Sequence, residues 1–556
     1  MTGALAEPGP CVVRTVADSA VSSVAADIAD EPCYATIAMG AALDDRPAGR
    51  GARVTSAPGA LWRWLLARPW IALIAALVAH VALWLAVQRD IATADPLGYS
   101  FHANRLAFQA SQLFAAHETH PFVMRLGLIA PLALLYRLFG VSTLVTNLPS
   151  LLAGLAIIAI AYAAASTPRG RLLAVGYAAV CTPLVVDGHE LTADLVCGAV
   201  MAASILCLSR RDRPRGASWV VAAAVVWFAA FQVKEIAVWC APVWVYATVR
   251  DLRDRGPRWV VHTFAPAAAA GAVLAAGYLV LCAAVWGDPL ARFHGIEDAA
   301  PGHYWSLGGH PAREWIARLT WQPPALLYRM FRAMLVPVVL SPWLVRGRDR
   351  IWVVATAAII LLYWFGSSTL AGYLPLPPHR RMLLAALPGL LVLAALATDA
   401  AVDRLGRRIR DPQLPATLGL AFAACLVVPH VATLRKRIFV ERPDSAAYAA
   451  LRAGAAATTD RLVVVCADAD CPGYTRFYFG WSPPANVAIV TAPEFAAAPL
   501  PPRAGVRLLV HLERSGKEAD RRAVALGLPP ITWFPDVRLY DAGDGARLHD
   551  ALAKPP

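Results

Sequence analysis

The residues with the clearest potential for chemistry lie in a short polar stretch between apolar segments, which runs from Asp95 through Tyr99 to His120. A carboxylate in such a place can orient an acceptor hydroxyl group and take its proton, as the general base does in inverting sugar chemistry. We therefore take Asp95 as the candidate catalytic residue, with Tyr99 and His120 as candidate substrate contacts. The plainer alternative for Asp95 is a solvated loop aspartate or a helix N-cap.

Three further polar groups stand at the ends of apolar segments: an acidic group, a Lys-Glu pair and an Arg-Arg pair. A guanidinium offers a planar fork of donors that matches phosphate oxygens, so the arginine pair is a candidate phosphate clamp. The plainer alternatives are interfacial solvation for the acids, a snorkelling ion pair for Lys-Glu and a lipid headgroup contact for the arginines. The candidate substrate-binding residues in these groups are Asp187, Glu190, Lys234, Glu235, Arg380 and Arg381.

The histidines of the polar stretches do not follow a metal-ligand spacing such as His-Glu-x-x-His. They are His102, His117, His120 and His189. We therefore assign no metal ligands and no certain cofactor, and we leave a divalent metal ion open.

The composition is that of a polytopic membrane protein, since 58% of the 556 residues are hydrophobic and only 16% are charged. The formal charge of +13 would also suit a nucleic-acid-binding protein, but the arginines fall in short clusters between apolar runs. We therefore expect no nucleic-acid partner and interpret the arginines first as topology signals.

The beginning of the chain sets the expected orientation. Residues 1–60 have no apolar period and no secretory signal, so we expect a disordered cytoplasmic tail. Arg63 and Arg68 precede the first apolar run, 70–87, and favour a cytoplasmic start for the first crossing. On this orientation Asp95 lies outside.

The apolar segment 122–139 is short and carries an arginine near each end, so its length does not decide whether it crosses the membrane. The later arginine clusters decide whether it crosses, because all of them lie inside only if this segment is a juxtamembrane or re-entrant helix. We adopt that option, which predicts about eleven crossings, a catalytic first external loop at about 89–141 and a second large external loop at about 286–325. The expected crossings are 70–88, 142–165, 172–186, 191–208, 218–233, 236–249, 259–285, 326–345, 351–371, 381–398 and 414–432.

The pattern changes at about residue 434, where short buried runs replace long apolar ones. Residues 434–556 are therefore predicted to form a small α/β domain outside the membrane, in the periplasm. Cys466 and Cys471 are the only cysteines of this domain and would lie in an oxidising compartment, which favours a local disulfide. The expected strands are 461–466, 486–490 and 506–510, and the expected helix is 515–526.

The motifs, in their order, are Asp95-Pro-Leu-Gly-Tyr99, His120-Pro121 with Leu138-Phe139-Gly140, Asp187 to Asp194, Lys234-Glu235, and Arg380-Arg381 leading to Pro388. This order resembles the GT-C superfamily of integral-membrane glycosyltransferases, most of all bacterial relatives of protein O-mannosyltransferases, lipid A aminoarabinose transferases and lipopolysaccharide sugar transferases. The resemblance covers about residues 60–400. It implies an all-α, GT-C-like membrane domain at 61–433, a catalytic carboxylate at Asp95 and a polyprenyl-phosphate sugar donor.

The sequence departs from this family at Pro96, because many relatives have an acidic residue next to the first-loop aspartate. The departure counts against a metal-assisted mechanism.

These observations predict an inner-membrane enzyme that transfers a sugar from a polyprenyl-phosphate donor to an acceptor hydroxyl at the outer face, with inversion. The acceptor is a glycan, a lipid or a protein, and Lys234, Arg380 and Arg381 would stabilise the leaving phosphate. Two alternatives stay open: a transporter or flippase of lipid-linked saccharides, and a non-catalytic membrane scaffold. A transporter would favour internal repeats and ionisable groups at mid-membrane, whereas most ionisable residues here stand at expected helix ends.

Overall fold

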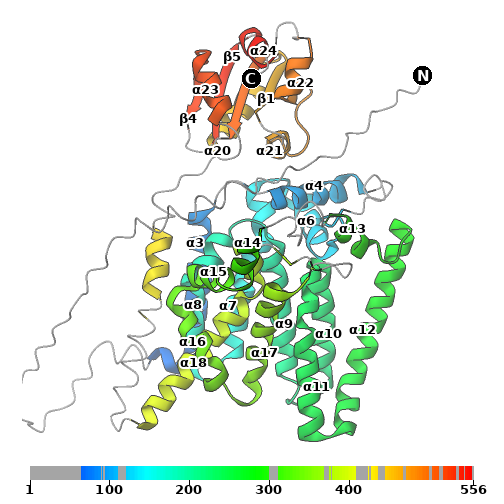
Figure 1. Ribbon diagram of the computed structural model, residues 1–556, viewed down its shortest axis with the longest axis vertical. Helices are drawn as coiled ribbons and strands as arrows, with labels where there is room; N and C mark the ends of the chain where they lie inside the picture. The colour runs from blue at the N-terminus through cyan, green and yellow to red at the C-terminus, as the bar shows by residue number, and fades with distance from the viewer. Residues whose placement is uncertain are drawn as a thin grey trace, which may run out of the picture.

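A helical bundle is followed by a small C-terminal sheet, as the sequence predicts (Figure 1). The computed structural model describes residues 64–553 apart from short gaps, so the expected tail 1–60 lies outside the described residues. The gaps are residues 89–90, 92–93, 111–119, 300–310, 368–372, 374, 377–378, 409–423, 425–426, 436–444, 468–470, 500–503, 512–516, 534–536 and 544.

Local sequence explains where several helices of the bundle begin. Thr167 caps α8 by accepting a hydrogen bond from the amide of Gly170, and Pro168 occupies the first turn, where no amide hydrogen is needed. The helices are α3 (Pro69–Val87), α4 (Ala94–Phe108), α6 (Leu126–Phe139), α7 (Thr143–Ala164), α8 (Pro168–Val180), α9 (Ala193–Ser209), α10 (Gly216–Val233), α11 (Ala241–Arg255), α12 (Pro257–Trp286), α13 (Ala291–Ala299), α14 (Ala312–Leu319), α15 (Gln322–Phe331), α16 (Leu335–Leu344), α17 (Arg350–Phe365) and α18 (Leu387–Arg408).

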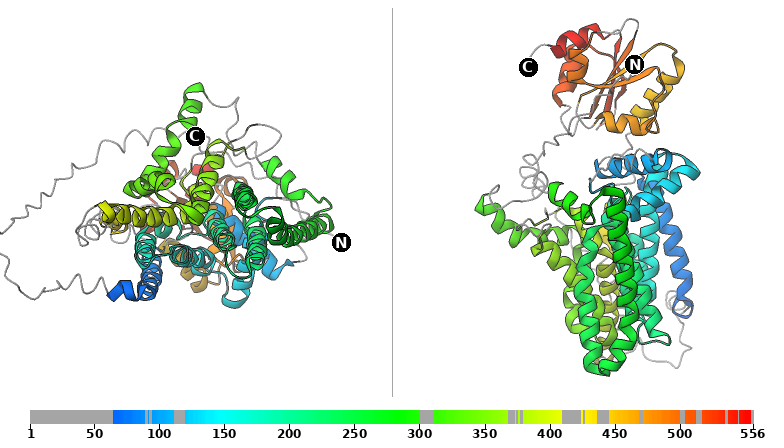
Figure 2. Two further views of the ribbon diagram at one scale, coloured as in Figure 1. Left: turned by 90° about the horizontal axis from the view of Figure 1, so that it is seen from below. Right: turned by 90° about the vertical axis from the view of Figure 1, so that its right-hand side faces the viewer.

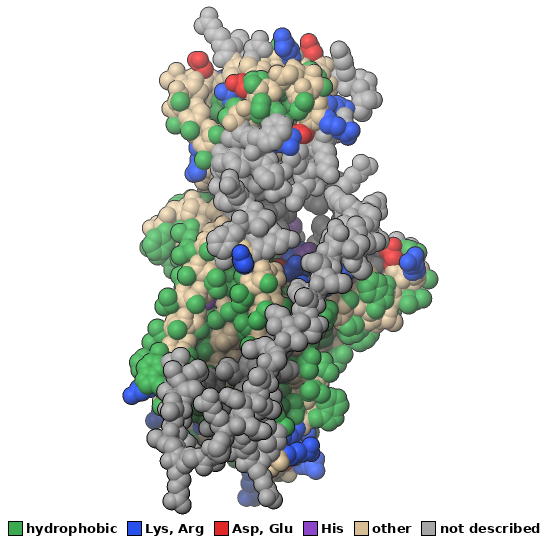
Figure 3. Space-filling view, turned by 90° about the vertical axis from the view of Figure 1, so that its left-hand side faces the viewer, with side chains coloured by type: hydrophobic (Ala, Val, Ile, Leu, Met, Phe, Trp, Pro, Cys, Tyr) green, Lys and Arg blue, Asp and Glu red, His purple; other side chains and the backbone are tan. Residues whose placement is uncertain are grey.

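Among the described residues, five stretches are long and apolar enough to cross a membrane. Figure 3 shows hydrophobic side chains spread over the flank of the bundle, with lysines and arginines gathered near its lower edge. This distribution fits an integral membrane protein, whereas the expected number of about eleven crossings stays a prediction. The five stretches are Pro69–Val87, Thr143–Ala164, Gly216–Val233, Pro257–Trp286 and Gln322–Leu344.

Some of the expected crossings differ from the helices observed. The crossing expected at 236–249 begins with a 3₁₀ segment, η2 (Glu235–Cys240), and continues in α11 to Arg255. The crossing expected at 172–186 divides into α8 and a π-helix, η1 (Pro183–Asp187), because a proline cannot donate to the preceding turn. The crossing expected at 326–345 is interrupted between α15 and α16 at Arg332, whose φ is +50°. The one expected at 381–398 begins with a 3₁₀ segment, η6 (Arg380–Ala385), and continues in α18 to Arg408.

The remaining differences concern loops. The second external loop, expected at 286–325, contains the helices α13 and α14. The last expected crossing, 414–432, lies largely outside the described residues.

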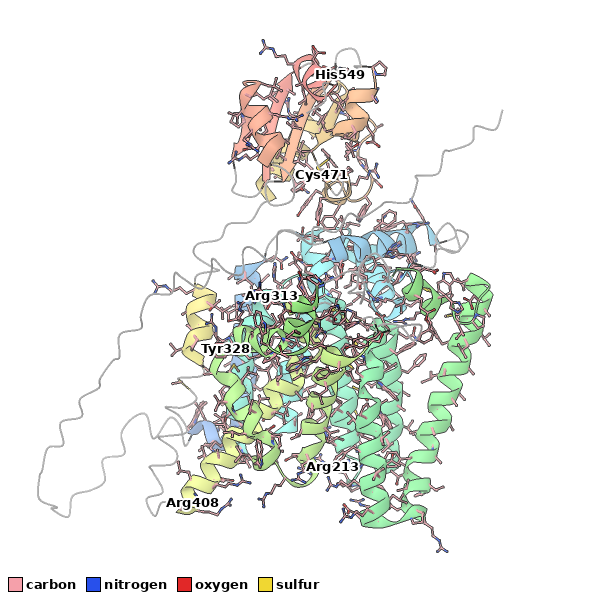
Figure 4. All side chains as sticks on the ribbon, in the orientation of Figure 1. Arg213, Arg313, Tyr328, Arg408, Cys471 and His549 are labelled. Carbon is pink, nitrogen blue, oxygen red and sulfur yellow. A yellow bond between two sulfur atoms is a disulfide. The ribbon has the colours of Figure 1, made fainter. Side chains whose placement is uncertain are left out.

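One end of the bundle is held together by arginines, and we call it the basic end. Arg169 at the start of α8 bonds Asp399 of α18 with 2.5 Å between Nε and Oδ1. Arg211 after α9 makes a buried pair with Asp251 of α11, with 2.5 Å between Nε and Oδ2. Figure 4 labels Arg213 and Arg408 at this same end. Further bonds here join Arg255 to Asp212, Arg250 to the Gly347 carbonyl and Arg404 to the Trp343 carbonyl.

The opposite end of the bundle carries α4, which lies across it (Figures 1 and 2). Both ends of α6 contact α4: Arg125, just before α6, bonds Tyr99, and Arg137 in its last turn donates to the Ala107 carbonyl at 2.7 Å. The helix α6 therefore runs beside α4. We call this end the site end, because it holds most of the candidate residues.

The C-terminal domain lies beyond α4 (Figure 2, right) and contains a five-stranded sheet of order β2-β1-β3-β5-β4. The strands β2, β1 and β3 are parallel, while β5 and β4 are antiparallel. The three parallel strands are apolar runs and were predicted from the sequence, whereas β4 and β5 were not. The elements are α20 (Ser445–Ala457), β1 (Leu462–Cys466), α21 (Cys471–Tyr478), β2 (Val487–Thr491), α22 (Ala492–Ala497), β3 (Gly505–His511), α23 (Lys517–Ala525), β4 (Pro530–Trp533), β5 (Val537–Gly543) and α24 (Ala546–Ala553).

A disulfide joins Cys466 at the end of β1 to Cys471 at the start of α21. It closes the loop between the two elements and fixes where α21 begins. This helix faces the bundle, as the position of Cys471 in Figure 4 shows.

Candidate active site

Asp95 lies in the first turn of α4, one helical turn from Tyr99, so both side chains share one face of the helix. Pro96 is tolerated there because the first turn needs no amide hydrogens. The Asp95 side chain is 27% exposed, and its Oδ2 lies 2.9 Å from Nη1 of Arg381. The expected catalytic carboxylate is therefore accessible and bound to one of the expected clamp arginines.

Arg380 and Arg381 do not bind the same group. Arg381 reaches Asp95, whereas Nη2 of Arg380 lies 3.0 Å from Oδ2 of Asp187, at the end of η1. The two arginines thus bind two different carboxylates. The Nε of Arg381 is buried without a hydrogen-bond partner among the described residues.

A buried arginine from α14 holds the segment that leads into η6. Arg318 is fully buried and donates to the backbone carbonyls of Tyr363, Trp364 and Leu376 at 2.8–3.2 Å. The Tyr363 hydroxyl in turn accepts a hydrogen bond of 2.8 Å from the amide of His379. These bonds fix the backbone immediately before the arginine pair.

Lys234 and Glu235 are adjacent in the chain but have different partners. Lys234 directly follows α10 as its C-cap residue, and its Nζ lies 2.7 Å from Oδ1 of Asp194, with both side chains buried. Asp194 stands in the first turn of α9, where the helix dipole favours a negative charge. The alternative of an interfacial Lys-Glu pair is therefore wrong: the lysine forms a buried bridge between α9 and α10.

Glu235 is held by two arginines. Arg125 binds it through two bonds, with 2.7 Å from Nη2 to Oε1 and 3.3 Å from Nε to Oε2. Arg292 of α13 approaches Oε2 at 3.5 Å and is 1% exposed. Burial alone would raise the pKa of Glu235, but the charges of Arg125, Arg292 and Lys234 outweigh it and hold the pKa well below its usual range. Glu235 is thus a fixed negative charge.

Sequence analysis missed Arg125 and Arg292. Arg125 was interpreted only as a charge at the end of an apolar segment, and Arg292 as part of a loop. Under the expected topology both stand on the external side, where the positive-inside rule disfavours arginine. Arg380 and Arg381 were identified because they are arginines on the external side, and the same criterion would have identified Arg125 and Arg292.

Tyr99 connects α4 to the arginines that bind Glu235. Its hydroxyl bonds Nη1 of Arg125, and its ring packs 4.7 Å from Phe122. Burial raises the pKa of Tyr99, although the charge of Arg125 lowers it, and the charges of Asp95, Asp194 and Glu235 raise it further. The hydroxyl therefore stays protonated, and Asp95, Asp194 and Glu235 belong to one electrostatic cluster.

Two expected site residues stand further from this cluster. Glu190 is buried beside His189, at 3.9 Å, and its backbone carbonyl accepts a hydrogen bond of 2.7 Å from Ser150 of α7. His120 is exposed, and its ring lies 4.7 Å from Phe122 and 6.2 Å from His102. A direct role for either residue stays a prediction.

The described residues contain no group of three or more His, Cys, Asp or Glu side chains arranged to hold a metal ion. The carboxylates of the cluster face cations: Asp95 faces Arg381, Asp194 faces Lys234 and Glu235 faces Arg125. The donor set offers charge-assisted hydrogen bonds to an anion.

Two cavities border the cluster. The first, of about 600 Å³, is lined by Arg380 together with Arg329 and Arg332. The second, of about 480 Å³, lies between α10, α11 and α12 and has an apolar lining. Phe231 lines this second cavity, and the Arg292 guanidinium stands 4.4 Å from the centre of its ring. Arg380 of the cluster thus lines the first cavity, and Phe231, which contacts Arg292 of the cluster, lines the second.

No protein-family model matches the sequence, and no curated protein matches it significantly. Solved structures do match its fold. Apo ArnT from Cupriavidus metallidurans, at 14% identity, aligns with a TM-score of 0.55 over 89% of this chain and 100% of ArnT. The same protein bound to undecaprenyl phosphate aligns with a TM-score of 0.54 at 15% identity, over 88% of this chain and 99% of ArnT.

ArnT is an aminoarabinose transferase of the GT-C superfamily. The expected resemblance to this superfamily is therefore confirmed at the level of the fold.

Proposed function

We propose that this protein transfers a sugar from a polyprenyl-phosphate donor to an acceptor hydroxyl, with Asp95 as the general base. The observation that carries the proposal is the cluster of ion pairs that includes Asp95 and Arg381 at one end of an apolar bundle. The fold supports it, because the ArnT structure with the same architecture holds undecaprenyl phosphate.

The ion pairs of the cluster leave positive charge and hydrogen-bond donors unused. Glu235 serves two arginines, so the five bridges bring together five cations and four carboxylates. The Nε of Arg381 and the Nε and Nη1 of Arg292 are buried without partners among the described residues. Each unsatisfied donor costs about 1–3 kcal/mol, and a phosphate offers the oxygens that would satisfy it.

The reaction we propose is a single displacement. The acceptor oxygen attacks the anomeric carbon, the bond from that carbon to the phosphate oxygen breaks, and the electron pair leaves with the polyprenyl phosphate. Asp95 takes the hydroxyl proton, using the oxygen that Arg381 does not bind. Arg381 and Lys234 stabilise the charge on the leaving phosphate. A single displacement inverts the configuration at the anomeric carbon.

The cavities differ in the ligand that they suit. The apolar cavity beside Phe231 fits the prenyl tail, because its lining is almost entirely hydrocarbon and Phe231, one of its lining residues, contacts Arg292. The cavity beside Arg380 fits the acceptor, and its three arginines favour an acceptor that carries negative charge. Asp95 is bonded to Arg381, the residue that follows Arg380.

We assign the basic end to the cytoplasm and the site end, with the periplasmic domain 434–556, to the outer face of the inner membrane. The arginine-rich loops of the basic end support this orientation. Reporter proteins fused after Arg171 and Arg213 should give a cytoplasmic signal, and fusions within residues 436–444 an external one. An external signal at Arg213 would reverse the assignment.

The proposal is tested with the purified full-length chain in lipid nanodiscs. Undecaprenyl phosphate should raise the melting temperature, whereas undecaprenol, which has the same tail without the phosphate, should not. Mass spectrometry of envelope lipids and glycans from cells with and without the protein then identifies the sugar and the acceptor. No binding of undecaprenyl phosphate and no altered envelope component would contradict the proposal.

A further inference from the structure

The helix α4 has two faces with different neighbours. Asp95 and Tyr99, four residues apart, face the cation cluster. Leu97, Ser100 and Phe101 lie on the other side, because each residue turns the helix by about 100°. These three residues contact the C-terminal domain, which covers α4 in Figures 1 and 2.

Trp481 makes the most specific of these contacts. Its indole Nε1–H donates a hydrogen bond of 3.1 Å to Oγ of Ser100, and its ring lies 5.1 Å from that of Phe101. Leu97 packs so closely against Gly473 of α21 that a Cβ at Gly473 would lie 2.9 Å from it. A side chain at position 473 would therefore require the Leu97 side chain to shift.

The segment before Asp95 is also tied to the C-terminal domain. Ile91 is buried in the same hydrophobic cluster as Tyr448 and Tyr474, and Leu97 packs against this cluster. Asp95 is thus bracketed by two residues that are anchored in the C-terminal domain.

Trp481 has an unusual backbone for a bulky residue. Gly480 ends α21 in the left-handed region, and the amides of Gly480 and Trp481 bond back to the carbonyls of Phe477 and Arg476. Trp481 itself has a φ of +65°. This conformation costs about 1–3 kcal/mol for a residue other than glycine and persists only where the surroundings impose it. It directs the indole ring to α4.

The contact continues into the bundle. Oγ of Ser100 is 2.6 Å from the Tyr136 hydroxyl of α6, which is 2.7 Å from Oγ1 of Thr146 of α7. Hydroxyls in a row can each donate one hydrogen bond and accept another, so the four side chains form one continuous chain. It joins the C-terminal domain to α4, α6 and α7.

We propose that Trp481 is a positioning residue: the C-terminal domain clamps the outer face of α4 and thereby fixes Asp95 on its inner face against the donor. The catalytic part of this inference rests on the proposed sugar transfer. Movement of a reacting group by about 1 Å can cost about 100-fold in rate, so the clamp matters for turnover even though it touches no substrate.

The test compares Trp481→Ala with Trp481→Phe in the full-length protein. Trp481→Ala should lower kcat about 10- to 100-fold and leave KM for both substrates unchanged, because the binding cations stay in place. Trp481→Phe keeps the ring and should recover part of the rate. Ser100→Ala removes the indole bond and also the bond to Tyr136, so it should lower kcat at least as much as Trp481→Phe. The double variant should be no worse than Ser100→Ala, because the indole bond is already lost there. The control is Val524→Ala, an exposed residue of the same domain.

A second measurement does not depend on activity. Amide hydrogen exchange of α4 should be faster in Trp481→Ala than in the wild type, while exchange in α7 and in the sheet of the C-terminal domain should not change. Unchanged protection of α4, or an unchanged kcat in Trp481→Ala, would overturn the inference. Failure of the proposed function has a different signature: a wild type that binds no polyprenyl phosphate but whose α4 still loses protection in Trp481→Ala.

Discussion

The two ends of the helical bundle hold their arginines in different ways. At the basic end, each of the three side-chain nitrogens of Arg211 donates a hydrogen bond: two go to the oxygens of Asp251 and one to the Leu208 carbonyl. No arginine of this end has a buried nitrogen without a partner among the described residues. At the site end, Arg292 and Arg381 both have such nitrogens.

We interpret this difference as one between charges that stabilise the fold and charges that, in the proposed function, bind an anion. An arginine whose nitrogens all have partners stabilises the contact between two helices. An arginine with a buried nitrogen that has no partner is a cost to the fold, which a bound anion would offset. The same residue type at the two ends should therefore respond in opposite ways to mutation: stability should fall at one end, ligand binding and turnover at the other.

The largest effect is expected from Asp95→Asn. Asparagine has the size of aspartate but cannot take a proton at neutral pH, so kcat should fall about 100- to 10,000-fold. The protein should still bind undecaprenyl phosphate in a thermal-shift assay. The matched control is Asp403→Asn at the basic end, an exposed partner of Arg169, which should keep normal turnover. Near-normal turnover in Asp95→Asn would make Asp95 a structural residue.

The next effect concerns stability at the basic end. Arg211→Ala leaves the carboxylate of Asp251 buried without its cation, and removal of one partner of a buried pair costs about 3–5 kcal/mol. The free energy of unfolding in detergent should fall by that amount. The dissociation constant for undecaprenyl phosphate, measured where the variant is still folded, should not change. A large loss of affinity would show that the two ends are coupled.

The corresponding variant at the site end is Arg381→Ala. It removes a charge-assisted phosphate contact worth about 1.5–3 kcal/mol, which weakens undecaprenyl phosphate binding about 10- to 150-fold. Stability should change little, because the Arg381 side chain is about one-third exposed and leaves Asp95 in contact with water. Titration followed by tryptophan fluorescence measures the affinity. Equal affinity in variant and wild type would remove Arg381 from the phosphate site.

The sequence predicted the positions of the charges better than their partners. Asp95, Lys234 and Arg381 were identified because they stand at the ends of apolar runs, which composition reveals. Their partners depend on how helices pack and rotate. Arg125 and Glu235 are 110 positions apart, and no local pattern connects them.

The contact between Trp481 and α4 could not be predicted for the same reason. Ser100 and Trp481 are 381 positions apart and lie in regions predicted as separate domains. The turn that directs Trp481 depends on a left-handed tryptophan, which propensity disfavours. Long-range contacts of this kind require the structure.

The smallest effect is expected from Arg380→Ala, and it distinguishes the two members of the arginine pair. Arg380 is 47% exposed, and its bridge to Asp187 should contribute no more than about 1 kcal/mol to stability. Arg380 lines the cavity that we assign to the acceptor, whereas Arg381 binds Asp95. Arg380→Ala should therefore raise KM for the acceptor a few-fold and leave the affinity for undecaprenyl phosphate unchanged. Steady-state kinetics with each substrate varied in turn would measure both. A loss of donor affinity equal to that of Arg381→Ala would mean that the pair acts as a single phosphate clamp, as the sequence suggested, and that the acceptor enters elsewhere.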